Sequence, residues 1–372
     1  MIIRKLNFKF INLILLALFV FASCKKDTVT DQNQTLIDQM QVVTDSIIEY
    51  SHVPGVVALV VDHKLGIDWV YTAGLSDIPN KKPMDPNYTF RIGSNTKTMT
   101  GTVLLQLVEE GKLDLEDKLS EFFPQYPKSD SVTIAMLCNM MSGIFNYSED
   151  PGWDTELVTN PTKVWTPEET VAIGFSRDYY FSPGTGSHYS NTNTFLLGMI
   201  IEKLTGNSLE YEIENRIIKP LQLNNTGFLT SGLELPGTHG RGYYDGVYVE
   251  NEDMTEHYDV SWAWAAGSAY STPRELQQYV ENLVGGGFLS DEMHQKRLSE
   301  VNEIMPHTAY GLCILKRGSF YGHNGGLPGF TSSMYHSNEK DCTVILYFNS
   351  QIELVPDYLF LRYMDILYGS DF

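Results

Sequence analysis

The chain has 372 residues and carries 46 acidic against 26 basic side chains, a formal net charge of −20. Hydrophobic residues make up 42% and charged residues 19%, which is typical of a globular protein and excludes a disordered chain. The acidic balance argues against nucleic acid as a partner, because phosphate binding needs Lys and Arg gathered on one face.

The first residues have the layout of a secretory signal. Residues 1–9 include three basic side chains, and Phe10–Phe21 is almost wholly apolar but shorter than the roughly 20 residues that span a membrane. Small residues directly before Cys24 resemble the lipobox of bacterial lipoproteins, in which this cysteine is lipidated and becomes the first residue. An uncleaved N-terminal anchor is the alternative, and both interpretations hold the protein at a membrane outside the cytosol.

The lipoprotein resemblance implies three parts of the chain. Residues 1–23 would be a signal peptide, residues 24–35 a polar tether that starts at the lipidated Cys24, and residues 36–372 the exported body. Loss of three positive charges with the signal changes the net charge from −20 to −23, so we expect the body to stand off anionic lipid. The implied location is the bacterial cell envelope, in the periplasm or at the outer membrane, with the lipid as the link to the membrane.

The remaining cysteines are too few and too scattered for a disulfide scaffold. Once Cys24 carries lipid, the chain keeps Cys138, Cys313 and Cys342, and three thiols cannot all pair. A bridge between Cys313 and Cys342 stays open, although two separate buried thiols are favoured. Because Cys and His are not clustered at ligand spacing, we expect neither a metal nor an organic cofactor. No pattern indicates an oligomeric state.

Hydrophobic periodicity predicts helices and strands in the N-terminal part of the body. They are a helix over 36–47 ended by Pro54-Gly55, a hairpin of Val56–Asp62 with Ile67–Thr72, and a helix from Ser94 to Gly111. A loop-rich region of about 115–235 follows, with helical pieces that include Thr194–Leu204, ended by Gly206.

The C-terminal part returns to strands and closes with a helix. The expected strands are Tyr310–Lys316, Ser319–His323, Thr331–Ser337 and Cys342–Phe348, and the last helix is Pro356–Tyr368. Strands at both ends with helices between them predict an α+β fold of the three-layer α/β/α type. One antiparallel sheet is then built from both termini, with the helical lobe of about 115–235 inserted into it. We expect the active site where the two lobes meet.

The first motif with chemical meaning is Ser94–Lys97, which reads Ser-x-x-Lys at the start of a predicted helix. Residues three apart share a helix face, so the Ser94 hydroxyl and the Lys97 amine can approach each other. A serine hydroxyl becomes a nucleophile when an adjacent base takes its proton, and lysine can be that base when burial lowers its pKa. The same pattern at Ser337–Lys340 falls in a charged turn between strands, so the motif by itself is weak.

The second motif is Tyr189–Asn191, a Tyr-x-Asn just before the predicted helix at Thr194. A tyrosine beside a lysine ammonium has its phenolate favoured and can relay protons as a general base and acid. The Asn191 side chain both donates and accepts, which suits it to orient the lysine and a substrate amide. A second copy at Tyr347–Asn349 lies inside a predicted strand, where a tyrosine is more simply a sheet residue.

The third motif, His323–Gly325, reads His-x-Gly and occurs once in the chain. It ends a short predicted strand and enters a glycine-rich turn, where glycines let the backbone pass close to a ligand. The backbone N–H of Gly326 can form an oxyanion hole together with that of Ser94. The plain alternative is a hairpin turn with a surface histidine.

The three motifs, in this order and context, resemble the serine β-lactamase and penicillin-binding-protein superfamily. The likeness is closer to its class C β-lactamase and D-Ala-D-Ala carboxypeptidase branch and covers most of residues 36–372. It implies that Ser94 is the acylated nucleophile and Lys97 its proton partner. Tyr189 would be the base that assists acylation and activates the deacylating water.

The resemblance also implies residues that bind and orient the substrate. Asn191 would hold Lys97 and the substrate amide, and His323 and Gly325 would meet the substrate at the sheet edge. His323 stands where many relatives have lysine, and as a largely neutral group it weakens the case for carboxylate binding and efficient β-lactam hydrolysis. The segment Asn139–Gly143 departs from the usual His-Thr-Ser-Gly.

The leading hypothesis is a serine hydrolase that forms an acyl-enzyme on Ser94. Its expected substrates are D-amino-acid-terminated peptides or related amides, and a carboxylesterase or a class C-like β-lactamase is the alternative. A non-catalytic module that binds cell-wall fragments is an alternative of a different class. Aromatic residues expected near the cleft are Phe145, Tyr147, Trp262, Trp264 and Tyr270, whereas those expected to pack in the core are Trp153 and Trp165.

Overall fold

The computed structural model describes residues 29–244, 252–299, 301–305, 307–352 and 355–369. Within this part of the chain, nine strands form one sheet: β1 (Gly55–Asp62), β2 (Ile67–Asp77), β3 (Lys82–Pro83), β9 (Asn302–Met305), β10 (Thr308–Gly311), β11 (Ile314–Arg317), β12 (Phe320–Leu327), β13 (Phe330–Ser337) and β14 (Cys342–Phe348). Their order is β3-β2-β1-β14-β13-β12-β11-β10-β9, and neighbouring strands run antiparallel. Because β1 pairs with β14, the two ends of the chain meet inside one sheet, as the sequence predicts.

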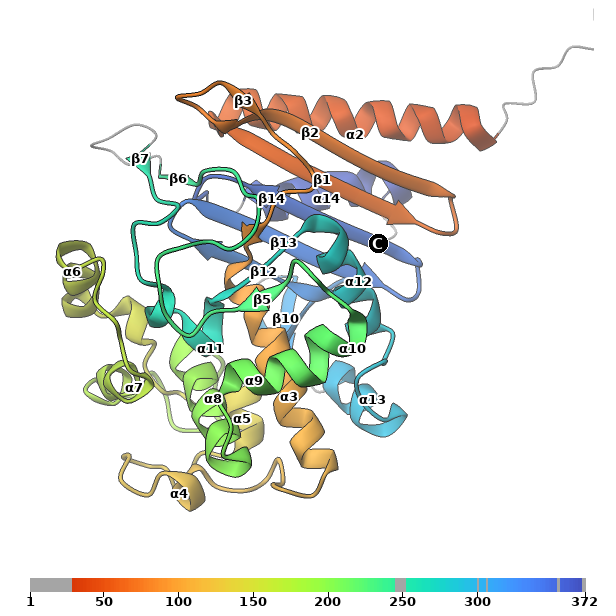
Figure 1. The fold of residues 1–372 in the computed structure, drawn as a ribbon. Coiled ribbons are helices and arrows are strands. Elements are labelled where there is room, and N and C mark those ends of the chain that lie inside the picture. The colour runs from red at the N-terminus through yellow and green to blue at the C-terminus, as the bar shows by residue number, and fades with distance from the viewer. Residues whose placement is uncertain (1–28, 245–251, 300, 306, 353–354, 370–372) are drawn as a thin grey trace, which may run out of the picture.

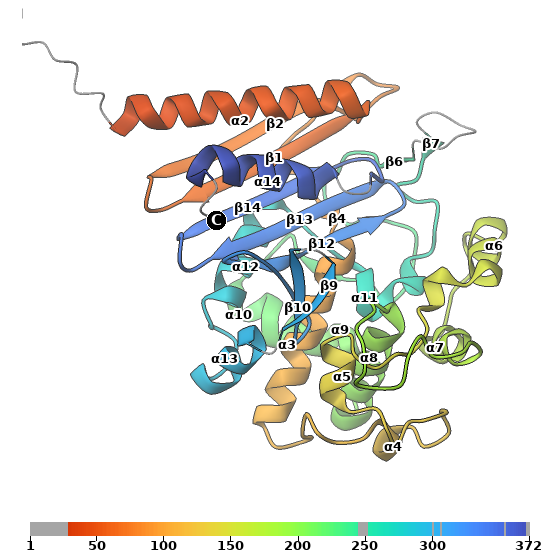
Figure 2. The ribbon, with the colours of Figure 1, turned by 180° about the vertical axis from the view of Figure 1, so that it is seen from behind.

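Helices cover both faces of this sheet (Figures 1 and 2). On one face, α2 (Val29–Ser51) and α14 (Val355–Tyr368) pack on each other and on the strands beneath them. On the other face, α12 (Pro273–Val284) packs on β12, β13 and β14, and α3 (Thr96–Glu109) lies against β11. All residues of β1 and β14 are buried because both faces are covered, which is why these strands are almost continuously apolar. The three-layer α/β/α arrangement is confirmed.

The helical lobe lies below the sheet in Figure 1 and is inserted between β4 and β9 in the chain. Its helices are α4 (Leu119–Phe122), α5 (Ile134–Cys138), α6 (Pro151–Thr159), α7 (Pro167–Phe175), α8 (Asn191–Thr205), α9 (Leu209–Ile213) and α10 (Lys219–Leu221). The longest, α8, ends at Gly206 with φ +72°, a left-handed residue that is typical of a helix C-terminus. The remaining short elements lie within the lobe or between it and the strands of the large sheet. They are β4 (Phe90–Arg91), β5 (Gly227–Phe228), β6 (Tyr243–Tyr244), β7 (Glu252–Asp253), β8 (Ala269–Ser271), η1 (Gly93–Asn95), η2 (Tyr147–Glu149), η3 (Glu214–Ile218), η4 (Val260–Trp262), α11 (Trp264–Gly267) and α13 (Asp291–Ser299).

Two strand predictions are wrong in detail. The run Tyr310–Lys316 is not one strand, because β10 and β11 form a hairpin whose two-residue turn contains Cys313 at φ +56°. This turn is apolar and buried and lacks the Gly, Asn or Pro that usually marks a turn, so the sequence does not reveal it. Strand β12 continues past the predicted end at His323 to Leu327, which places the His-x-Gly motif inside a strand.

The N-terminal helix begins earlier than expected. Because α2 starts at Val29, the last residues of the predicted tether, 29–35, are helical and continue into the helix that packs on the sheet. The predicted signal peptide, residues 1–23, and the lipidation residue Cys24 lie outside the described residues. Within the described ranges, no helix combines the length and the apolar character required to cross a membrane.

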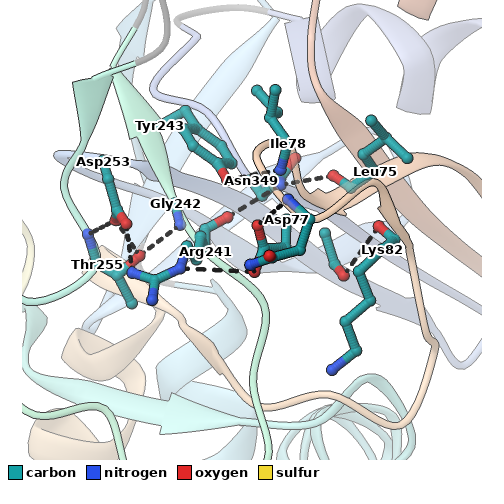
Figure 3. A network of polar contacts seen from close by, with 12 residues as sticks. Leu75, Asp77, Ile78, Lys82, Arg241, Gly242, Tyr243, Asp253, Thr255 and Asn349 are labelled. Atoms are coloured by element: carbon teal, nitrogen blue, oxygen red, sulfur yellow. Dashed lines mark hydrogen bonds and ion pairs between the residues drawn. The ribbon is translucent and has the colours of Figure 1, made fainter.

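A polar network lies at one corner of the molecule, where the ends of β2 and β14 meet the chain around β6 and β7 (Figure 3). Asn349 Nδ2 donates to the carbonyl oxygens of Leu75 at 2.9 Å and Arg241 at 3.0 Å. The Arg241 guanidinium pairs with Asp253 and lies 3.7 Å from Asp77. The network therefore links the end of β2 and the chain around Arg241 to the end of β14.

Candidate active site

Ser94 lies at the centre of η1, a 3₁₀ turn that leads directly into α3. Its side chain is partly exposed, whereas the flanking Gly93 and Asn95 are buried. Gly93 has φ +53°, a left-handed conformation that glycine adopts without steric cost. The turn therefore presents the Ser94 hydroxyl at the N-terminus of α3, where the helix dipole favours developing negative charge.

Strand β12 approaches this turn closely because it carries Gly325. A Cβ on Gly325 would lie 2.1 Å from the Ile92 carbonyl oxygen and 2.8 Å from the Ser94 nitrogen, so a side chain here would push the strand away from η1. The Asn95 Nδ2 group donates to the Ile92 carbonyl at 2.6 Å and to Ser332 Oγ at 2.8 Å. These contacts fix the nucleophile turn against the sheet.

Lys97 lies one helical turn after Ser94 and is fully buried. Its Nζ lies 2.9 Å from Ser94 Oγ and donates to the Ala266 carbonyl at 2.8 Å. Burial lowers the pKa of Lys97 well below its ordinary value. A neutral amine with a free electron pair beside the hydroxyl is what deprotonation of Ser94 requires.

Tyr189 brings its phenol to the same hydroxyl from the helical lobe. Its side chain is hydrogen-bonded to Ser94, and its ring centroid lies 5.0 Å from Lys97 Nζ. Burial raises the pKa of Tyr189, and the Ser94 hydrogen bond offsets this only in part. The expectation that a lysine ammonium favours the phenolate is therefore wrong for the free protein, because burial drives the amine itself neutral. Tyr189 remains a proton donor at neutral pH.

His323 lies beneath Tyr189 rather than at the surface, with 1% of its area exposed. The ring centroids of Tyr189 and His323 are 6.1 Å apart. Nδ1 lies 2.5 Å from the Asn324 carbonyl oxygen and Nε2 lies 3.2 Å from Tyr310 Oη, which assigns Nδ1–H as donor and Nε2 as acceptor. Burial is the main cause that lowers the pKa of His323, to about 3. His323 is therefore a neutral support for Tyr189, and the expected neutrality is confirmed.

Tyr310 is the main residue at this site that the motifs do not indicate. It is fully buried, its ring centroid lies 5.9 Å from that of Tyr189, and it meets His323 edge-on. The sequence shows it as one apolar residue of a predicted strand, with no motif around it. The Ala266 carbonyl, which holds Lys97, was also without a predicted role.

The glycines of β12 supply the second backbone N–H expected at the oxyanion hole. The turn Pro328-Gly329 closes the β12–β13 hairpin, so Leu327 and Phe330 form its first hydrogen-bonded pair. Alternation along the strand then turns the N–H of Gly326 away from β13. The pairing of β12 with β11 ends at Gly322, and beyond it this edge of β12 contacts η1. The N–H of Gly326 therefore lies on the edge of β12 that contacts η1, the turn that carries Ser94.

Asn191 is the first residue of α8 and holds a neighbouring loop rather than the lysine. Its backbone N–H donates to Asn146 Oδ1 at 3.0 Å, and its Nδ2 donates to Ser148 Oγ at 3.0 Å. Lys97 is instead held by Ser94 and the Ala266 carbonyl. Asn191 is partly exposed beside Tyr189, which is compatible with the predicted contact to a substrate amide.

Asn324, the middle residue of the third motif, turns to the opposite face of the sheet. Its Nδ2 donates to Asp357 of α14 at 2.9 Å, and the same carboxylate oxygen lies 2.8 Å from Arg317 Nη2. Neighbouring side chains of a strand point to opposite faces, so His323 and Asn324 cannot both face Ser94. The Asn324 side chain therefore lies away from the reacting groups.

The aromatic residues divide into core and surface. Trp153 and Trp165 are buried, as predicted, and so are Tyr147 and Trp264 from the expected cleft set. Tyr270 is partly exposed but lines a different pocket, together with Glu210 and Phe228. The two that remain partly exposed near the motif residues are Phe145 and Trp262.

The three cysteines outside the N-terminal segment form no disulfide, and Cys138 and Cys313 contact each other. Cys313 and Cys342 are buried thiols without a disulfide between them, which confirms the favoured alternative. The backbone N–H of Cys313 instead donates to the Cys138 carbonyl at 2.9 Å. In the described part of the chain, no three His, Cys, Asp or Glu side chains are grouped so that they could hold a metal ion.

Comparison with solved structures finds close matches of the whole body. A D-stereospecific amidohydrolase from Streptomyces sp. is 30% identical with a TM-score of 0.77, over 86% of this chain and 95% of that chain. The D-amino acid amidase from Ochrobactrum anthropi SV3, in complex with D-phenylalanine, is 27% identical with a TM-score of 0.78, over 90% of this chain and 99% of that chain.

Comparison of the sequence alone gives the family. Protein flp of Staphylococcus aureus (strain N315) is 26% identical over 342 residues, which are 86% of this chain. The chain spans only 65% of the length of that relative. The family model described as Beta-lactamase matches residues 40–360, most of the chain. The chain therefore belongs to the Beta-lactamase family.

Proposed function

We propose that this protein is a serine hydrolase that cleaves amide bonds through an acyl-enzyme on Ser94. The observation that carries the proposal is the position of the Ser94 hydroxyl. It lies 2.9 Å from the Lys97 amine, whose neutral form burial favours, and it is hydrogen-bonded to the Tyr189 phenol. Backbone N–H groups of Ser94 and Gly326 lie beside it. Nucleophile, base, proton donor and oxyanion donors thus meet at one point.

Acylation follows from this geometry. Ser94 Oγ bonds to the substrate carbonyl carbon while Lys97 Nζ takes the hydroxyl proton. The carbonyl oxygen becomes an oxyanion that the two N–H groups stabilise. The carbon–nitrogen bond then breaks, and the leaving amine receives its proton through the Tyr189 hydroxyl. The products of this half-reaction are the free amine and an ester on Ser94.

Deacylation repeats these steps with water in the place of the amine. A water molecule gives a proton to the Lys97–Tyr189 pair as its oxygen bonds to the ester carbon. The second oxyanion forms in the same position and collapses, and Ser94 Oγ leaves with a proton. The acid product dissociates and the free enzyme is restored.

The substrate class that we propose is an amide or peptide in which a D-amino acid flanks the scissile bond. Its support is the similarity to a D-stereospecific amidohydrolase and to a D-amino acid amidase that binds D-phenylalanine. A neutral His323 in place of a lysine supports the same choice over a β-lactam or a carboxylate-terminated substrate.

A covalent probe tests the nucleophile. Mass spectrometry after treatment with a fluorophosphonate should find one adduct, on a peptide that contains Ser94, and Ser94→Ala should prevent it. An unmodified folded protein, or an adduct that survives in the variant, would refute the proposal. Turnover of D- and L-phenylalanine amide, a p-nitrophenyl ester, nitrocefin and a D-Ala-D-Ala peptide then separates an amidase from an esterase, a β-lactamase and a carboxypeptidase.

The non-catalytic alternative makes a different prediction for the same panel. A module that only binds wall fragments should bind them without turnover, and Tyr189→Phe should leave that binding unchanged. The proposed hydrolase should instead lose turnover in the same variant. Retained turnover in Tyr189→Phe would therefore exclude the proton-relay role of this phenol.

We also propose that the protein is exported and held at a membrane by lipid on Cys24. The helix that packs on the sheet begins at Val29, so only residues 25–28 separate the cysteine from the body. Four extended residues reach about 14 Å, which would keep the body close to the membrane. Incorporation of labelled fatty acid in cells, and its loss in Cys24→Ser, tests the anchor.

A further inference from the structure

The loop that is hydrogen-bonded to Asn191 carries a carboxylate that the mechanism does not use. Glu149 ends η2, and 46% of its side chain is exposed. Its Oε2 accepts a hydrogen bond from Tyr180 Oη at 2.6 Å. Its Oε1 accepts one from Asn146 Nδ2 at 3.1 Å and lies 3.3 Å from His188 Nε2. Three contacts from three segments therefore fix the position of this carboxylate.

The carboxylate keeps both its charge and a free acceptor position. Partial burial raises the pKa of Glu149, but the hydrogen bonds from Tyr180, Asn146 and His188 outweigh burial and lower the pKa overall. A carboxylate offers about four acceptor positions, and the three contacts leave one of them. This position belongs to an exposed group, so a ligand can reach it.

The loop that carries Glu149 is attached to the catalytic segment. Asn146 Oδ1 accepts a hydrogen bond from the Asn191 backbone, and Ser148 Oγ accepts one from the Asn191 side chain. His188, which contacts Glu149, directly precedes Tyr189 in the chain. The carboxylate therefore contacts the residue before Tyr189, and the loop that carries it is held by Asn191, two residues after Tyr189.

Charges near the reacting groups favour a cationic substrate end over an anionic one. Burial lowers the pKa of Lys97 and of His323 and so favours the neutral form of both, which makes them poor partners for a substrate carboxylate. Arg177 contacts the residue that follows Glu149, and it is paired there with Asp150 at 2.5 Å. Glu149 is left as an exposed, ionised group on the loop that Asn191 holds, and a substrate carboxylate placed there would be repelled.

We propose that Glu149 binds the free α-ammonium group of the substrate and thereby selects amides and peptides whose acyl part is an unblocked amino acid. The inference rests on the proposed function and narrows it, from D-amino-acid amides in general to an amidase or aminopeptidase rather than a carboxypeptidase. Glu149 then acts as a specificity residue. The substrate ammonium donates a hydrogen bond to Glu149 Oε2 and forms an ion pair with the carboxylate, and this contact positions the substrate carbonyl carbon over Ser94.

Competition against p-nitrophenyl acetate turnover tests this without requiring that an amide be hydrolysed. The competitors are D-phenylalanine amide, its N-acetyl derivative and 3-phenylpropanamide, which differ at the α-nitrogen. We expect the wild-type protein to bind the ammonium compound about tenfold more tightly than either of the others. Glu149→Gln should abolish this preference and leave inhibition by the N-acetyl compound unchanged.

Glu156→Gln is the matched control, because it removes a carboxylate of the same lobe whose ion pair, among the described residues, is with Lys163 at 3.5 Å. It should keep the preference. Equal inhibition by all three compounds in the wild-type protein overturns the inference, and so does an equal loss for all three in Glu149→Gln. Should that variant not fold, the wild-type preference is compared at low and high salt. It should shrink as salt rises, and a preference independent of salt overturns the inference.

The experiment distinguishes a failure of the proposed hydrolase function from a failure of the proposed ammonium contact. Absence of ester turnover together with absence of a Ser94 adduct refutes the hydrolase and the inference with it. Intact turnover with no preference for the ammonium compound refutes the inference alone.

Discussion

Lys97 and Arg241 are two cations of one molecule in opposite surroundings. Arg241 belongs to the network of Figure 3, with 48% of its side chain exposed and an ion pair to Asp253. That hydrogen-bonded pair raises the pKa of Arg241 and keeps it charged. Lys97 is fully buried, and its Nζ contacts a hydroxyl and a carbonyl oxygen instead of a carboxylate. Burial lowers its pKa, so the same kind of residue becomes a base.

The other polar groups differ between the corner of Figure 3 and the active site in the same way as Arg241 and Lys97 do. At the corner of Figure 3, a hydrogen bond from Asn80 lowers the pKa of Asp77, which favours the charged form. At the active site, burial raises the pKa of Tyr189 and lowers that of His323, which favours the neutral form of both. Exposure with a counter-ion therefore gives structural ion pairs, and burial without one gives groups that can exchange protons.

The largest effect is expected when the buried amine of Lys97 is removed. Lys97→Ala should lower the rate of acylation about 10²- to 10⁴-fold, because no other group takes the Ser94 proton. The rate of fluorophosphonate labelling, followed by mass spectrometry, measures it. The thermal midpoint of the variant must stay close to that of the wild-type protein. Labelling at the wild-type rate would assign the base to another residue.

The pH dependence of acylation tests the direction of both pKa shifts. Acylation needs neutral Lys97 and protonated Tyr189, so the rate should fall tenfold per pH unit below the lowered pKa of the lysine. It should stay level above this value until the raised pKa of Tyr189 is approached, beyond its ordinary value of about 10. A rate that still rises with pH near 10.4, the ordinary value for lysine, would mean that Lys97 is not desolvated.

The adjacent residues Gly325 and Gly326 differ in the space around them: Gly325 is closely packed, and Gly326 has open space beside it. Gly325→Ala should lower the free energy of unfolding by about 1–3 kcal/mol and lower activity, because its Cβ would meet the Ile92 carbonyl at 2.1 Å. Gly326→Ala is the control for stability, since a Cβ there meets no atom within 4 Å. Urea unfolding of the two variants measures the difference. Equal stability would show that β12 does not need its close approach to η1.

The neutral histidine should appear in the pH dependence of stability. The pKa of His323 is about 3 in the folded protein and about 6.5 in an unfolded chain. Between these values the unfolded chain binds the extra proton, so the free energy of unfolding falls as pH falls, by about 1.4 kcal/mol per pH unit. Urea unfolding of His323→Gln should lack this part of the loss between pH 7 and 4.5. Parallel losses in both proteins would contradict a neutral His323.

The sequence predicts the parts of the site that depend on motifs and strand order. Ser94, Lys97, Tyr189 and Gly325 come together as expected, because a sheet built from both termini brings β12 next to the start of α3. The short range of the Ser-x-x-Lys pattern also fixes the contact between hydroxyl and amine, since residues three apart share a helix face.

Other parts depend on contacts that no local pattern contains. The β10–β11 turn at Cys313 is apolar, and its left-handed residue is held by burial rather than by turn chemistry. Tyr310 supports His323 only because β10 and β12 lie in the same sheet. The protonation states of Lys97 and Tyr189 depend on how deeply the assembled lobes bury them, and composition does not reveal that.

The smallest effect is expected at the exposed cation. Arg241→Gln removes the ion pair with Asp253, yet exposed ion pairs contribute about 0–1 kcal/mol, so the free energy of unfolding should fall by less than about 1 kcal/mol. The Arg241 carbonyl still accepts from Asn349, because this hydrogen bond uses the backbone. Acylation of Ser94 should keep its wild-type rate. A loss of activity comparable with that of Lys97→Ala would mean that the corner of Figure 3 is coupled to the active site, and the division between structural and reactive cations would no longer hold.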